Sequence, residues 1–118
     1  MDDALLSATK FYDVKANTPI VLVVEVGDNQ VGGTALQLNG SPVPFNPIGP
    51  TPIGAPGQDL RRSVLQVVTT VKDVNPKSNH TSVTHHFRGG VTDESFPFEV
   101  SVKADKGIAR YFITYILA

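Results

Sequence analysis

The sequence lacks cysteine and tryptophan altogether. Without cysteine the chain has no disulfides, no thiolate ligands for zinc and no thiol nucleophile. It also lacks long apolar runs: the longest, residues 20–24, is far too short to cross a bilayer, so we expect no membrane span. The N-terminus begins Met-Asp-Asp, whereas a signal peptide needs a basic start followed by an apolar run. We therefore expect no signal peptide and a cytoplasmic location.

Neither sign of charge dominates the composition. Ten Lys and Arg stand against 11 Asp and Glu, which gives a net charge of −1. Binding to nucleic acid draws on clustered positive charge, so we expect no nucleic-acid partner. Hydrophobic residues make up 41% of the 118 residues, which is enough apolar material for a core. The length suits a single domain, which we expect to span residues 1–118.

What the sequence does contain is a repeated alternation of apolar and polar residues, which is typical of strands with one buried face. No long segment shows the 3.6-residue apolar period of a helix. The pattern predicts strands near 5–14 and at 20–26, 34–38, 64–72, 81–88, 96–103 and 108–117. The residues expected to face inward include Leu65, Val67, Thr69 and Val71; Val83, His85 and Phe87; Phe96, Phe98, Val100 and Val102; and Ala109, Tyr111, Ile113, Tyr115 and Leu117.

Turn-forming residues separate these strands, and Asp105-Lys106-Gly107 is typical of a compact hairpin turn. The pattern predicts an all-β fold, an immunoglobulin-like β-sandwich of about 7–8 antiparallel strands. The Cys pair and buried Trp of antibody domains are absent from the sequence. Residues 39–57 hold six prolines and four glycines. Because proline resists central strands, we interpret this Pro/Gly-rich segment as a long loop or as a cover for a sheet edge.

The three histidines, His80, His85 and His86, lie close together in the sequence. Neighbouring residues of a strand point to opposite faces, so His85 and His86 cannot readily share one metal ion. His85 shares the apolar face of its strand, and we expect it to be a buried, hydrogen-bonded residue. If the strand bulges, His80 and His86 can converge, and they are the candidate metal ligands.

Two loops carry most of the other candidate ligands. The first, residues 73–79, offers several oxygen atoms of the kind that hard cations prefer, but it lacks the central Gly and distal Glu of an EF-hand. Asp and Asn also shape loops by bonding their own backbone, and this is the default interpretation. The second loop follows Gly89-Gly90. The candidate ligand-binding residues are Asp73, Asn75, Asn79, His80, Asp93 and Glu94.

No catalytic motif stands out in the chain. No serine lies in a Gly-x-Ser-x-Gly motif, and no glycine-rich loop has the residues that hold a phosphate, so we expect no catalytic residue of these kinds and no cofactor. We therefore predict a non-catalytic binding or assembly module that contacts a protein or a glycan through its loops or an exposed sheet face. The inward positions of Tyr111 and Tyr115 weaken the glycan hypothesis, since sugars are commonly bound on exposed aromatic rings.

Two strands carry apolar residues on both faces. These are residues 20–26, with Val21 and Val23 on the second face, and residues 108–117, with Ile108, Phe112 and Ile116 there. Self-association would cover such surfaces, so we expect a homo-oligomer, most simply a dimer. Two alternatives stay open: a small metal-dependent hydrolase that uses His80 and His86 with a loop carboxylate, and a structural protein that self-associates.

Overall fold

The computed structural model describes residues 4–28, 30–75, 77–103 and 106–118. These residues form nine strands in two sheets, and no helix is found among them. None of the described segments could therefore cross a membrane as a helix. The strands are β1 (Ala4–Tyr12), β2 (Ile20–Val26), β3 (Val31–Leu38), β4 (Ser41–Val43), β5 (Thr51–Ile53), β6 (Ser63–Lys72), β7 (His80–Arg88), β8 (Glu94–Ser101) and β9 (Ile108–Leu117).

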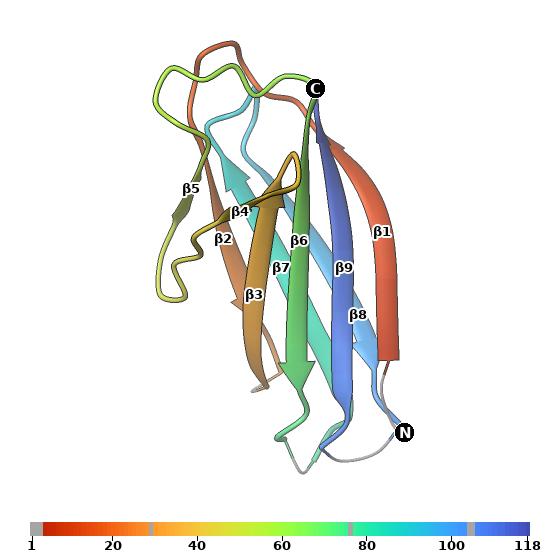
Figure 1. The fold of residues 1–118 in the computed structure, drawn as a ribbon. Helices are drawn as coiled ribbons and strands as arrows, with labels where there is room; N and C mark the ends of the chain where they lie inside the picture. The colour runs from red at the N-terminus through yellow and green to blue at the C-terminus, as the bar shows by residue number, and fades with distance from the viewer. Residues whose placement is uncertain (1–3, 29, 76, 104–105) are drawn as a thin grey trace.

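The strands form a five-stranded sheet in the order β1-β9-β6-β3-β4 and a four-stranded sheet in the order β5-β2-β7-β8 (Figure 1). We predicted about seven or eight strands, all antiparallel, and this was wrong in two respects. The described residues form nine strands, and among these the β1–β9 pair is parallel whereas the other pairs are antiparallel. Both β1 and β9 run from the same end of the molecule, so their pairing depends on the path of the whole chain.

Most connections cross from one sheet to the other. Only β3–β4 and β7–β8 are consecutive strands that lie side by side in one sheet. The segment between β8 and β9 therefore joins two different sheets, and the hairpin turn predicted at residues 105–107 is wrong. Asp105 itself lies outside the described residues.

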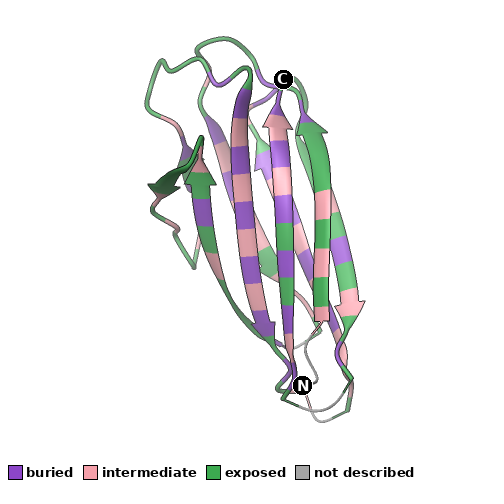
Figure 2. Cartoon of the chain, turned by 45° about the vertical axis from the view of Figure 1, so that its right-hand side comes forward, coloured by how far each residue is buried: buried purple, intermediate pink, exposed green. Residues whose placement is uncertain are grey.

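The core lies between the two sheets, and the inward faces follow the predicted alternation. Along the whole of β6 and β9, buried residues alternate with more accessible residues, so that one face of each strand is buried (Figure 2). Tyr111 and Tyr115 are fully buried, as expected. Each large apolar side chain buried in this way contributes about 1.5–3 kcal/mol of transfer free energy. The fully buried members of these two strands are Leu65, Val67, Thr69, Val71, Ala109, Tyr111, Ile113, Tyr115 and Leu117.

The Pro/Gly-rich segment 39–57 supplies an edge strand to each sheet. The three-residue strand β4 pairs with β3, and the three-residue strand β5 pairs with β2. Each contains a proline, Pro42 in β4 and Pro52 in β5. Proline has no N–H to donate and is tolerated at an edge, where one side of the strand has no partner. The segment therefore lies at sheet edges, which was one of the two interpretations of the sequence, but the two short strands within it were missed.

Candidate functional site

His85 belongs to the core. Its ring is fully buried, and its Nδ1 lies 2.6 Å from the hydroxyl of Tyr115. Burial lowers the pKa of His85 from 6.5 to about 4, and the neighbouring His86 adds to the effect. The ring is therefore neutral near pH 7. Its Nε2 has no hydrogen-bond partner among the described residues, so the buried, hydrogen-bonded histidine that we expected is satisfied on one side only.

The regular geometry of β7 keeps the other two histidines apart. His80 and His86 both lie on the outer face of β7, six residues from one another, which is about 20 Å along a strand. The bulge that would bring them together is absent from this described strand. Among the described residues, no group of three or more His, Cys, Asp or Glu is placed to hold a metal ion. The predicted pair of metal ligands is thus not brought together.

His80 lies between two carboxylates instead. Its Nδ1 is 3.0 Å from Oδ2 of Asp28, and its Nε2 is 3.3 Å from Oε2 of Glu99. The three residues come from the β2–β3 turn, the start of β7 and the edge strand β8. All three are accessible to solvent, so these contacts contribute little to stability.

His86 connects a serine to a glutamate across three neighbouring strands. Its Nδ1 lies 2.7 Å from Oγ of Ser95 on β8, and its Nε2 lies 2.9 Å from Oε1 of Glu25 on β2. A proton on Nε2 would be donated to Glu25, which leaves Nδ1 to accept the hydroxyl proton of Ser95. Sequence reasoning missed both partners, because only the strand register places Ser95 opposite His86. An open cavity of 310 Å³ adjoins Glu25 and His86 and is bounded by residues 46–49.

The candidate residues of the first loop hold that loop together. Asp73 is buried and accepts a hydrogen bond from Nε2 of Gln30 at 2.8 Å. The Gln30 side-chain oxygen in turn accepts the N–H groups of Val74 and Asn75 at 2.7 and 3.0 Å. The backbone carbonyl of Asn79 accepts the N–H of residue 102 at 2.9 Å. Asp73 and Asn75 therefore act in loop structure, as in the default interpretation.

The second loop lies at the other end of the molecule. Asp93 accepts the N–H of Gly89 at 3.3 Å, and Glu94 begins β8. These residues follow the end of β7, whereas His80 begins it. The six candidate ligand residues are thus divided between opposite ends of the sheets, and they do not form one site.

Comparison of the chain with family models, with curated proteins and with solved structures finds no match. The function is therefore inferred from the surfaces of the molecule itself.

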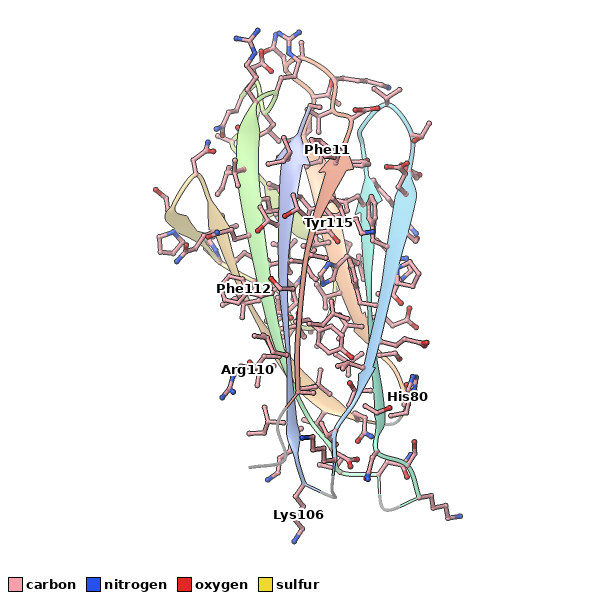
Figure 3. The ribbon with its side chains drawn as sticks, turned by 90° about the vertical axis from the view of Figure 1, so that its right-hand side faces the viewer. Phe11, His80, Lys106, Arg110, Phe112 and Tyr115 are labelled. Atoms are coloured by element: carbon pink, nitrogen blue, oxygen red, sulfur yellow. The ribbon has the colours of Figure 1, made fainter. Side chains whose placement is uncertain are left out.

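The outer face of the five-stranded sheet, which points away from the other sheet, is the most apolar surface of the two sheets. Leu5 and Phe11 of β1 are each 67% exposed, and Phe112 of β9 is 43% exposed. Figure 3 shows Phe112 and Arg110 extending away from the four-stranded sheet, whereas Tyr115 lies between the sheets. Val64, Val68 and Ile116 are half-buried apolar residues of the same face, which also carries the polar residues Gln66, Thr70 and Thr114.

The outer face of the four-stranded sheet is mainly polar. Its three longer strands present Glu25, His80, Ser82, Thr84, His86, Arg88, Ser95, Pro97, Glu99 and Ser101, and Val21 and Val23 are its half-buried apolar residues. The contrast between the two faces separates the two surfaces that the sequence predicted as dimer contacts. The surface on β9 is part of a larger apolar face, whereas the surface on β2 is surrounded by polar residues.

A groove of 720 Å³ opens on the side of the molecule where β2 and β3 extend beyond their short edge partners β5 and β4. Strand β5 pairs with β2 only as far as Leu22, and β4 pairs with β3 only from Leu36 onward. The described lining carries no titratable side chain, so the groove offers shape and backbone groups rather than acid–base chemistry. It is lined by Val24, Val26, Gln30, Val31, Gly32, Gly33, Thr34, Phe45 and Pro47.

Proposed function

We propose that this chain is a non-catalytic assembly module that self-associates through its five-stranded sheet. The observation that carries the proposal is the exposure of Leu5 and Phe11 on an edge strand. On the same outer face, the neighbouring strand β9 places Ile116 beside Phe11 and Phe112 beside Ser7. Large contiguous apolar patches on a protein surface commonly mark interaction sites. Aromatic side chains in particular are enriched in the centres of protein interfaces.

A protein partner has more support than a glycan. All three tyrosines are buried in the core, and the exposed aromatic rings of the proposed face, Phe11 and Phe112, carry no polar group to pair with a sugar hydroxyl. The charged residues of the exposed face that the structure describes, Lys72 and Arg110, lie toward the same end of β6 and β9. The rest of that face is apolar or uncharged, which suits contact with another protein.

We retain the immunoglobulin-like class as a prediction about architecture only. An immunoglobulin constant domain places its last two strands, F and G, side by side in one sheet. Here the last two strands, β8 and β9, lie in different sheets. The sheet neighbour of β9 is β6, which is separated from it in the sequence by β7 and β8 of the other sheet. Two packed sheets are common to both, but the order of the strands differs.

Light scattering over a concentration series tests the proposed self-association. We expect the wild-type chain to form a dimer and Phe11→Thr to weaken it at least about tenfold, because a buried aromatic side chain contributes about 1.5–3 kcal/mol. The matched control is Val23→Thr on the other outer face, which should leave the dimer unchanged. A wild-type chain that is monomeric from micromolar to millimolar concentration would refute the proposal. If Val23→Thr weakened the dimer and Phe11→Thr did not, the contact would lie on the four-stranded sheet, and the proposal would be refuted as well.

Ester hydrolysis is a second candidate, supported by the Glu25–His86–Ser95 chain of hydrogen bonds. In this candidate His86 takes the hydroxyl proton of Ser95 as its oxygen attacks an ester carbonyl, and Glu25 orients the ring. The C–O bond to the alcohol then breaks, His86 returns the proton to the departing alcohol, and water hydrolyses the acyl-serine to release the acid. Labelling by a fluorophosphonate that is lost in Ser95→Ala but kept in Ser82→Ala would support it. No labelling of the wild-type chain would remove it.

A further inference from the structure

The four edge strands of the two sheets differ in how well they are protected from pairing with another chain. Strands β4 and β5 are three residues long and contain Pro42 and Pro52. The third edge strand, β8, contains Pro97 between Glu94 and Glu99. Short length, proline and charge are the usual means by which natural edge strands avoid pairing with other chains. Three of the four edges therefore carry such protection.

The fourth edge strand, β1, carries little of it. It is nine residues long, contains no proline, and has Lys10 as its only charged residue. It pairs with β9 along its full length, from Ala4 to Tyr12, and no described strand lies on its other side. The N–H and C=O groups on that side are therefore free to form a ladder with another strand.

The side of the molecule around β1 is apolar as well. Strand β1 lies beside β8 of the other sheet, and Lys10 Nζ lies 6.0 Å from the centre of the Phe98 ring. Several apolar residues of these two strands pack on the core but are only partly buried. They are Ala4, Leu6 and Ala8 of β1 and Phe96 and Val100 of β8. A partner on this side would bury them further.

We propose that β1 pairs antiparallel with β1 of a second copy, about a two-fold axis at Ala8. This inference rests on the proposed self-association and names its contact. In this register Leu5 lies opposite Phe11 of the other copy, and Ser7 lies opposite Thr9. The two most exposed apolar residues of β1, each 67% exposed, thus become cross-strand neighbours. Lys10 lies opposite Leu6 rather than another lysine.

The area available matches what a stable dimer needs. A nine-residue strand is about 30 Å long, and two sheets about 10 Å apart with their side chains make a side wall about 20 Å high. Such a wall covers about 600 Å² on each partner, or about 1,200 Å² in total, which is the lower end of the range for specific complexes. The pairing also joins the two five-stranded sheets into one sheet of ten strands with a continuous outer face.

Disulfide cross-linking tests this register directly, because the wild-type chain contains no cysteine. At the axis, Ala8→Cys would face its own copy at a Cα separation of about 4.5–5.5 Å, within the range that a disulfide spans. In Ser7→Cys the two cysteines would lie about 7–8 Å apart, beyond that range. Ser7 is the more exposed of the two, so random collisions would favour the control.

A second pair of variants keeps the test independent of how Ala8→Cys folds. Leu5→Cys and Phe11→Cys alter exposed side chains, and only their mixture should cross-link across the proposed contact. We expect covalent dimers from Ala8→Cys and from that mixture, and none from Ser7→Cys or from either single variant alone. Equal cross-linking of Ser7→Cys would overturn the register. Dimers in light scattering without any cross-link would overturn this inference but leave the proposed function, whereas monomers throughout would overturn both.

Discussion

Replacing His85 with phenylalanine tests how the buried histidine links stability to pH. In the folded protein burial lowers the pKa of His85 from 6.5 to about 4. In the unfolded chain the imidazole regains its ordinary pKa. Between these two values the unfolded chain holds a proton that the folded chain does not. The contribution of His85 to stability is therefore complete above about pH 6.5, is lost as the pH falls, and changes no further below about pH 4.

The size of the effect follows from the width of this window. From 6.5 down to about 4 the window covers about 2.5 pH units, and each unit corresponds to about 1.4 kcal/mol. The full loss is thus about 3–4 kcal/mol, of which about 2 kcal/mol falls between pH 7 and pH 4.5. This is a large part of the stability of a typical small domain.

Urea unfolding at pH 7 and at pH 4.5 measures the loss in the wild-type chain, His85→Phe and the control His86→Gln. All three proteins have the same carboxylates, which lose stability equally on acidification. The difference between their losses of stability therefore measures the contribution of the substituted histidine. We expect His85→Phe to lose about 2 kcal/mol less than the wild type. His86→Gln should lose nearly as much as the wild type, because burial is the larger cause of the lowered His85 pKa and His86 the smaller one. The free energy of unfolding at pH 7 alone is a poorer measure, because His85→Phe also removes the hydrogen-bond partner of the Tyr115 hydroxyl.

Two results would refute this reasoning. One is an equal loss of stability in the wild type and His85→Phe. The other is an NMR titration in which the folded His85 ring gains its proton near pH 6.5. Either result would mean that the ring is hydrated in the folded state and that the packing around it differs from that described here.

Two further substitutions test the loop and the crowded turn. Gln30→Ala should cost about 2–3 kcal/mol in urea unfolding, because the buried Asp73 carboxylate loses a hydrogen bond and the loop backbone loses its acceptor; a cost below about 0.5 kcal/mol would contradict the role given to Gln30. Gly90→Ala should lower the melting temperature, at a cost of about 1–3 kcal/mol, because a Cβ there would overlap the hydroxyl of Tyr12. Gly33→Ala, where a Cβ meets open space, is its control, and equal losses from both would contradict the crowding.

The strands themselves could be predicted from the sequence, because their signal is local. The alternation in residues 108–117 gave both the bounds of β9 and its buried face. The same alternation placed His85 inside, where it is found. An apolar–polar alternation with a period of two residues indicates which residues share a face of a strand. This alternation is visible within the strand's own residues.

Partners across strands could not be predicted in this way. The parallel β1–β9 pair and the crossing from β8 to β9 depend on how distant segments pack. The same is true of Glu25, which lies 61 residues from His86 in the sequence and within hydrogen-bond distance in the structure. The proline-containing strands β4 and β5 were missed because three residues are too few to show a period.

The position of β9 bears on how the chain folds as it is synthesised. β9 is the last strand in the sequence, yet it lies in the middle of its sheet, between β1 and β6. When the first eight strands have been translated, β1 and β6 still lack β9, the strand with which both of them pair. Pairings of such distant segments are slow to form, and open strand edges attract other chains meanwhile. Until residues 108–117 emerge, the nascent chain presents the edges of β1 and β6 to chaperones and to neighbouring nascent chains.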